Sequence, residues 1–172
     1  SIKVSPSSSI KIMSPPQSVL IQGSSRGIGL ALTNYYAKNS NVKHVFATCR
    51  NPVVAEELGK VCREYKGKVQ VLKIDVTDEE SIIAAAKEIK DSGKIERLDM
   101  LLNVAGVLQD KTSTPLTPII PETRLRMFDG ESAMKQFQVN SVGPMLMAKH
   151  FASLLSQTTT SSHDDVSNCL TM

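Results

Sequence analysis

Three glycines near the start of the chain have a spacing that suits phosphate binding. Gly23, Gly27 and Gly29 lie within LIQGSSRGIGLAL, after an apolar run and before a stretch with helical periodicity. In such a turn the first glycine permits a sharp bend, the second lets the backbone approach a pyrophosphate, and the third lets the helix pack close to the sheet. The free N–H groups and the dipole at the helix start attract the phosphates. The spacing therefore predicts a dinucleotide site at a strand-to-helix turn.

A second set of residues indicates which dinucleotide would bind. An acidic residue near the end of the second strand accepts hydrogen bonds from a ribose 2′-OH and selects NAD, but no acidic residue occurs from Val42 through Val54. Arg50 stands where a guanidinium could bind a 2′-phosphate in bidentate fashion, and Arg26 in the glycine loop could add a second charge. The pattern predicts NADP(H). If Arg50 and Arg26 are only solvated surface charges, the preference between the nucleotides is weak.

The elements that must position these residues alternate along the chain. Strands are expected at 19–22, 42–48, 68–74 and 98–104, and helices at 28–38, after Pro52, after Thr77 and at about 131–155. Alternation of this kind predicts an α/β fold with a parallel sheet, right-handed crossovers and helices on both faces. The glycine turn then lies at the first strand-to-helix junction, where a doubly wound sheet binds its ligand.

Two of the expected helices begin with capping signals. Asn51 precedes Pro52, and Thr77 precedes Glu80 by three residues, as in a capping box. The apolar positions at helical spacing are expected to face the core, namely Leu58, Val61, Cys62 and Tyr65 in the first helix and Ile82, Ile83, Ala86 and Ile89 in the second.

The glycine stretch resembles a known family fingerprint. Residues 22–29 read QGSSRGIG and are similar to the TGxxxGIG motif of the short-chain dehydrogenase/reductase family, with Gln22 in place of Thr. The runs QGSSRGIGL, ATCRNP and DVTDEESI resemble the C-factor-like subgroup, and the resemblance covers about residues 18–155. It implies a Rossmann-like, three-layer α/β/α fold with strand order 3-2-1-4, and NADP(H)-dependent hydride transfer between carbonyl and alcohol groups.

The same resemblance implies roles for further residues. Asp75 and Val76 match the pair that contacts the adenine ring, and NVAG at 103–106 matches the family's NNAG, with Val104 in place of the second Asn. Asn140 in FQVNSVGP matches the catalytic Asn that holds a water in the proton relay. Asp75 could instead merely end a strand, and Asn140 could be a buried polar residue bonded to backbone. The implied cofactor-binding residues are Gly23, Ser25, Arg26, Gly27, Ile28, Gly29, Arg50, Asp75, Val76, Asn103, Ala105 and Gly106.

The family's remaining catalytic residues find no match. The tyrosine and lysine of its YxxxK motif are absent, because Asn39, Ser40 and Val69 stand four residues after the three tyrosines. The chain therefore resembles the cofactor-binding part of a short-chain reductase, with a Rossmann fold that is incomplete at its C-terminal side. Truncation, alternative splicing or a faulty gene model would each explain this. The alternative function is a non-catalytic nucleotide-binding fragment that pairs with itself or with full-length relatives through helix 131–155.

Composition and missing motifs argue against several other classes of function. The net charge is only +3, and no block of Lys and Arg interleaved with aromatic residues argues for nucleic acid. No apolar run approaches the ~18 residues of a membrane span. No GxxxxGK[ST] motif indicates a P-loop hydrolase, and three scattered cysteines suggest neither a metal site nor disulfides. We expect a cytoplasmic protein that acts on a small carbonyl or alcohol substrate.

The two ends of the chain are expected to lie outside the folded domain. Residues 1–17 are rich in Ser and Pro, basic and free of acidic residues. They predict either a disordered leader or part of a transit peptide for a plastid or mitochondrion. Residues 156–172 are polar and lack periodicity, so a disordered tail is expected there. The NADP(H)-binding domain is then residues 18–155.

Overall fold

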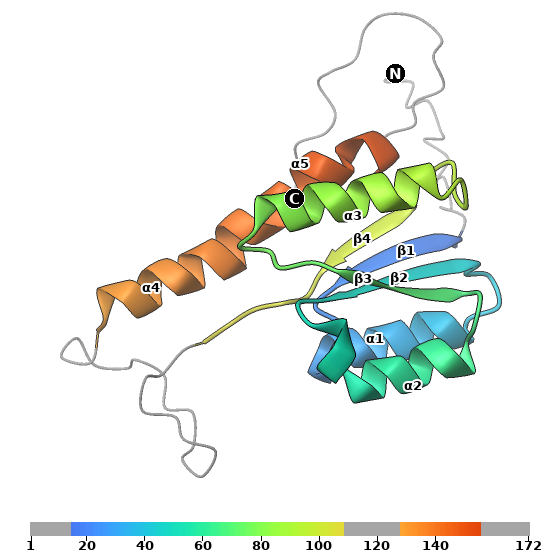
Figure 1. Cartoon of the computed structure of the whole chain (residues 1–172), viewed down its shortest axis with the longest axis horizontal. Coiled ribbons are helices and arrows are strands. Elements are labelled where there is room, and N and C mark those ends of the chain that lie inside the picture. Colours follow the sequence, from blue (N-terminus) through green and yellow to red (C-terminus); the bar gives the residue numbers. More distant parts are fainter. Residues whose placement is uncertain (1–14, 109–127, 156–172) are drawn as a thin grey trace, which may run out of the picture.

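A four-stranded parallel sheet lies at the centre of the molecule, between two layers of helices (Figure 1). The structure is a computed structural model that describes residues 15–108 and 128–155. The strand order is β3-β2-β1-β4, as the resemblance implied. The strands are β1 (Ser18–Gln22), β2 (His44–Cys49), β3 (Val69–Lys73) and β4 (Met100–Asn103).

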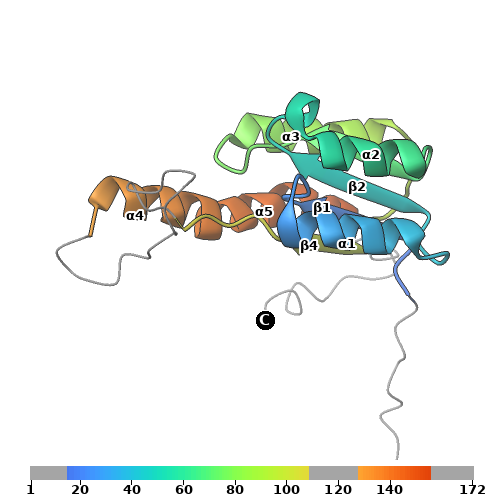
Figure 2. The same cartoon turned by 90° about the horizontal axis from the view of Figure 1, so that it is seen from below.

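The helices cover both faces of the sheet, so the Rossmann-like fold is confirmed. Helices α1 (Gly27–Lys38) and α2 (Glu56–Glu64) cover one face, whereas α3 (Glu79–Asp91) and α5 (Gly143–Leu155) cover the other (Figures 1 and 2). The helix expected at 131–155 has three parts. It begins as α4 (Gly130–Phe137), passes through a π-helical turn, η3 (Gln138–Val142), and continues as α5.

The strands bury apolar residues on both faces, which explains their nearly continuous apolar sequences. All five residues of β1 are buried. Alternate side chains point to opposite faces, so Leu20 joins the core under α3 and α5, while Val19 and Ile21 join the core under α1 and α2. The largest fully buried side chains of the first core include Phe46, Leu72, Ile82, Ile89, Leu98, Met147 and Phe151.

The register of the strands brings three polar side chains into one row. Gln22 ends β1 and pairs with Thr48 of β2 on one side and with Asn103 of β4 on the other. The carboxyl ends of these strands therefore meet at one edge of the sheet. In a doubly wound fold this is the edge at which ligands bind.

Two predicted helix starts are wrong in detail. Asn51 caps only the short 3₁₀ helix η1 (Pro52–Val54), where its Oδ1 accepts a hydrogen bond from Val53 N (3.3 Å), and α2 begins later, at Glu56. Helix α3 is capped by Asp78 rather than by Thr77. The hydroxyl of Thr77 donates to Asp75 Oδ1 (2.7 Å), and Thr77 N donates to the same oxygen (3.0 Å). Because these bonds form an Asx turn, the Thr77 hydroxyl does not cap α3.

The predicted core faces of α2 and α3 are largely right. Leu58 and Val61 are buried, and Cys62 and Tyr65 pack against the same core. In α3 the side chain of Ile83 is exposed rather than inward-facing. The buried face is instead formed by Ile82, Ala85 and Ile89, with Ala86 packed at its margin.

Several predictions concern residues outside the described ranges. Residues 1–14 of the predicted leader and the whole of the predicted tail, 156–172, belong to this group. Within residues 15–108 and 128–155, no helix combines the length and the apolar character needed to cross a membrane.

Candidate functional site

The turn after β1 requires glycine at its first position. Gly23 has a φ of +89°, in the left-handed region that L side chains rarely adopt. A Cβ at Gly23 would lie 2.7 Å from both the Cβ and the backbone N of Ala105. The turn after β1 is therefore packed directly against the segment that follows β4.

The other two glycines of the turn differ in their surroundings. Gly27 has a φ of +58°, and a Cβ placed on it would meet no atom within 4 Å, so the backbone is open to the outside there. At Gly29 a Cβ would lie 1.9 Å from the carbonyl oxygen of Gly23. Gly29 thus lets the start of α1 lie directly against the turn that follows β1.

The start of α1 keeps the features of an anion-binding helix end. Arg26 precedes the helix with an extended backbone and makes no side-chain cap, and the first turn contains no acidic residue. The N–H groups of that turn therefore have no acidic side chain of the turn itself beside them. Ser25, Arg26 and Ile28 are all exposed around this helix start.

Ser24 binds the turn after β1 to the two neighbouring strands β1 and β2. Its Oγ donates to Ile21 O (2.8 Å), and its backbone N donates to Thr48 O (2.8 Å). Ser24 is fully buried. The turn is thereby held to β1 and to the end of β2. No motif distinguishes Ser24 from its neighbour Ser25, so this role was not predicted.

Gln22 links the ends of β1 and β4. Its backbone oxygen accepts from Val104 N (3.0 Å) and Ala105 N (3.1 Å), and its side-chain Oε1 accepts from Ala105 N (3.0 Å). Val104, which stands where the family has a second Asn, packs against the apolar core under α1 and α2. Asn103 is exposed and Gly106 is exposed, so this segment presents an accessible surface beside the glycine turn.

Asn140 lies in the π-helical turn η3 and contacts the same segment. Its Oδ1 accepts from Val107 N and its Nδ2 donates to Val107 O, each over 2.8 Å. These are the backbone bonds that the alternative interpretation expected, but the residue is exposed rather than buried. Gly106 is close by, since a Cβ there would lie 3.5 Å from Asn140 Oδ1. Isolated π turns within helices often occur at functional sites.

Asp75 and Val76 follow β3 and are held by neighbouring helices. Asp75 N donates to Ser81 Oγ (3.0 Å), and the carboxylate Oδ1 is engaged by Thr77. Val76 is buried, and a Cβ on Gly143 would lie 2.8 Å from its Cβ. Gly143 therefore lets the start of α5 approach this segment closely.

Two arginines at this edge have no ion-pair partner in residues 15–108 and 128–155. Arg50 directly follows β2, and Arg26 lies in the turn after β1. Both are exposed, and the Ser24–Thr48 hydrogen bond joins the segments that carry them. The positive charges of the edge are thus not neutralised by the described part of the chain.

The predicted site residues gather at the carboxyl ends of the four strands. The segment after β4 contacts both the turn after β1 and η3. Arg50 and Asp75 follow the next two strands of the same parallel sheet. The arrangement offers open backbone and positive charge for an anionic ligand. The three tyrosines lie elsewhere, two of them on α1 and the third directly after α2.

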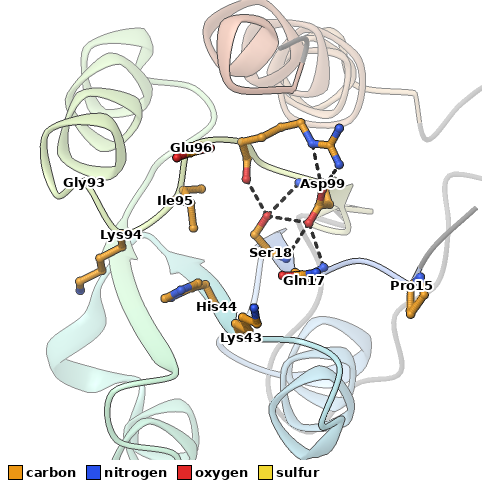
Figure 3. A pocket seen from close by; sticks show the side chains of 11 residues that line it. Pro15, Gln17, Ser18, Lys43, His44, Gly93, Lys94, Ile95, Glu96 and Asp99 are labelled. Carbon is orange, nitrogen blue, oxygen red and sulfur yellow. Dashed lines mark hydrogen bonds and ion pairs between the residues drawn. The ribbon is translucent and has the colours of Figure 1, made fainter. Parts of the chain in front are cut away.

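A cavity of about 620 Å³ lies at the opposite edge of the sheet, near the amino ends of β1, β2 and β4 (Figure 3). Its central carboxylate belongs to Asp99, which accepts from Gln17 N, Ser18 N, Ser18 Oγ and the Arg97 guanidinium. Burial raises the pKa of Asp99, but these hydrogen bonds outweigh it and the pKa is lowered overall. The network fixes β4 beside β1 and leaves the carboxylate engaged. No predicted site residue lines this cavity.

In the described ranges no three His, Cys, Asp or Glu residues are placed to hold a metal ion.

Comparison with known proteins gives a consistent result. A family model described as short chain dehydrogenase matches residues 17–162. Over 129 residues the chain is 33% identical to the short-chain dehydrogenase srdE of Neurospora crassa. The matched region covers 75% of this chain and 37% of the fungal protein.

Solved structures resemble the chain over a similar length. One is the NADPH-bound carbonyl reductase from chicken fatty liver, with a TM-score of 0.70, 28% identity and coverage of 81% of this chain and 51% of that one. Another is a metagenomic short-chain oxidoreductase in complex with NADP, with a TM-score of 0.60, 26% identity and coverage of 80% and 56%. The carbonyl reductase fits the C-factor-like subgroup that the motifs resemble. The chain spans about half the length of these structures.

Proposed function

This chain belongs to the short-chain dehydrogenase family, and from that premise we propose that it binds NADP(H) at the carboxyl edge of its sheet. The observation that carries the proposal is the glycine turn, in which open backbone at Gly27 begins a helix whose first turn has no acidic residue. The related structures with bound NADPH and NADP support the choice of nucleotide.

Each part of the nucleotide has a candidate partner. The pyrophosphate would lie on the backbone of residues 23–29 and the start of α1. The 2′-phosphate would pair with Arg50 and Arg26, whose charges no described acid neutralises. Asp75 and Val76 would contact the adenine. Asp75 Oδ2 accepts no hydrogen bond from the described residues and is available for this contact. Asn103, Ala105 and Gly106 would line the nucleotide on the side of β4.

The proposed reaction is hydride transfer between the nicotinamide and a small carbonyl or alcohol. The bound cofactor would supply the hydride. The proton that moves to or from the substrate oxygen would need a donor other than a YxxxK tyrosine, because none of the three tyrosines is followed by Lys four residues later. Asn140 is proposed to hold a water in that relay through the second lone pair of Oδ1 or the second N–H of Nδ2, since each atom makes one bond to Val107.

The alternative function is nucleotide binding without turnover, with pairing to another protein of the family. The sequence lacks YxxxK, and several large apolar side chains of α4 and α5 are exposed, namely Met134, Phe137 and Met145. A helix face of this kind favours association with another chain. Phe137→Glu is expected to reduce the sedimentation coefficient of the full chain if that association involves the α4 face.

A calorimetric titration and a turnover assay test these proposals together. The full chain is expected to bind NADPH more tightly than NADH, and equal affinities would contradict the proposed nucleotide. With NADPH and a panel of aldehydes and ketones, turnover on the order of 1–10³ s⁻¹ would be that of an ordinary enzyme. Binding without turnover would favour the alternative function, in which the chain acts only with a partner.

A further inference from the structure

We propose that the side chain of Gln22 is a nucleotide-positioning group, whose Nε2 donates a hydrogen bond to the diphosphate while its Oε1 holds the segment after β4. The inference rests on the proposed nucleotide site. It concerns a position at which this chain departs from the TGxxxGIG pattern by carrying Gln in place of Thr.

The orientation of the Gln22 amide is fixed by its partner. Ala105 N is a donor and lies 3.0 Å from the side-chain oxygen, so the atom facing Ala105 must be the acceptor Oε1. The other end of the amide is then the donor Nε2. In the described ranges this Nε2 makes no hydrogen bond, although the residue as a whole is only 4% exposed.

The unused donor is nevertheless open to a ligand. Among the described residues, Asn34 Oδ1 and Thr48 Oγ1 are the side-chain atoms that lack both solvent access and a hydrogen-bond partner. Gln22 Nε2 also lacks a partner but does not belong to this group. It must therefore keep some solvent-accessible surface. A buried amide with one donor left open is costly unless something accepts from it.

The position of Gln22 indicates which part of the nucleotide would accept. Gln22 ends β1 and directly precedes Gly23, whose turn leads to the start of α1. In this fold the pyrophosphate lies at that turn and at the helix N-terminus. A diphosphate oxygen is charged, and a hydrogen bond to a charged group is stronger than a neutral one.

The same side chain would couple binding to the shape of the site. Its Oε1 bond and the close contact between Gly23 and Ala105 hold the glycine turn against the segment of Asn103 to Gly106. A ligand that engages Nε2 therefore fixes both segments through one side chain.

Two probes separate the proposed contact from a general effect on the fold. NADPH contains the diphosphate, whereas adenosine 2′-monophosphate contains only the adenosine and the 2′-phosphate. Gln22→Leu removes the donor and the acceptor, and it is expected to weaken NADPH binding by about tenfold or more while leaving adenosine 2′-monophosphate within about twofold. Gln70→Leu removes an amide from β3 and is the matched control, which should not alter either affinity.

The possible outcomes are distinct. If the unmodified full chain binds neither probe, the proposed nucleotide site fails and the inference fails with it. If the unmodified chain binds both but Gln22→Leu binds NADPH normally, the inference alone is overturned. It is also overturned if Gln22→Leu loses affinity for both probes equally, because the role is then only structural.

A second variant covers the case in which Gln22→Leu does not fold. Gln22→Glu keeps an acceptor for Ala105 N but replaces the donor with a group that repels phosphate. Its affinity for NADPH is expected to fall by at least as much as in Gln22→Leu, with adenosine 2′-monophosphate much less affected. Unchanged NADPH affinity, or an equal loss for both probes, would overturn the inference.

Discussion

The side-chain amide of Asn140 and the backbone of Val107 form a reciprocal pair of hydrogen bonds, each 2.8 Å long. The pair joins η3 to the segment after β4 across 33 residues of sequence. Because both the oxygen and the nitrogen of the amide form hydrogen bonds, the contact fixes the orientation of Val107 as well as its distance from the π turn. This relationship leads to the first prediction.

Asn140→Leu removes both bonds and should release the Val107 segment. Each bond contributes about 0.5–1.5 kcal/mol, and we expect a total near the low end, about 1 kcal/mol, because Asn140 is exposed. Hydrogen exchange at Val107 N should accelerate relative to Gln138→Leu, a control in the same turn. Equal exchange in the two variants would contradict the prediction.

Arg50→Ala should reduce the preference for NADPH over NADH. If the guanidinium pairs with the 2′-phosphate, its loss should cost about 1.5–3 kcal/mol, or about ten- to a hundredfold in NADPH affinity. The affinity for NADH should stay nearly the same because that nucleotide lacks the 2′-phosphate. Calorimetry on the full chain measures both, and Arg63→Ala on α2 is the control. A parallel loss for the two nucleotides would assign Arg50 a role other than 2′-phosphate recognition.

Gly29→Ala should disrupt the turn after β1. The added Cβ would lie 1.9 Å from the carbonyl oxygen of Gly23, so the backbone must move. Overpacking of this kind costs about 1–3 kcal/mol, and the free energy of unfolding should fall by that amount together with NADPH affinity. Gly59→Ala is the matched control. Its Cβ would meet only the flexible end of Arg63 at 3.3 Å, and Ala favours the helix by up to ~1 kcal/mol over Gly. Full stability in Gly29→Ala, measured by denaturant unfolding, would refute this.

Glu79 should make the stability of the α3–α5 contact depend on pH. Its Oε1 accepts from Lys149 Nζ (2.8 Å) and lies 2.6 Å from His150 Nε2. Hydrogen bonds from Lys149 and His150 lower the pKa of Glu79 below its ordinary value of 4.5. A carboxyl group with a depressed folded-state pKa stabilises the protein fully above its unfolded value, and this contribution is lost as the pH falls through the folded value.

Thermal unfolding of the full chain and of Glu79→Gln from pH 7 to pH 3 tests this. The difference in melting temperature should shrink toward zero as the pH falls below the ordinary pKa of 4.5. Glu80→Gln, on the same helix, is the control. A difference that grew on acidification would mean that the Glu79 contact does not stabilise the folded state through its charge.

The fold could be predicted from the sequence because its signals are local. Apolar runs, helical spacing and the glycines at 23, 27 and 29 each depend on a few consecutive residues, and they gave the alternation correctly. The strand order came from the resemblance to a family. The start of α3 was misplaced because Asp75, two residues earlier, engages Thr77. The π turn could not be seen, because residues 138–142 have the same helical pattern as their neighbours.

The candidate site was predictable only in part. The residues that motifs identify do gather at one edge of the sheet, but their roles remain predictions. Gln22 and Ser24 were not singled out as anchors because their partners depend on tertiary structure. Gln22 meets Ala105, 83 residues away, only when β1 and β4 are in register. Ser24 meets Thr48 O only when β1 and β2 lie side by side.

The packing of Gly23 against Ala105 also has a consequence for biosynthesis. β1 is an inner strand of the sheet, yet its neighbour β4 is translated about 80 residues after it. Until residues 100–105 emerge from the ribosome, one side of β1 lacks its native neighbour and the glycine turn lacks the surface that shapes it. Such distant pairings are slow to form and expose strand edges in the meantime. A nascent chain that ends after β3 therefore has the complete glycine motif in its sequence without the geometry that the motif requires.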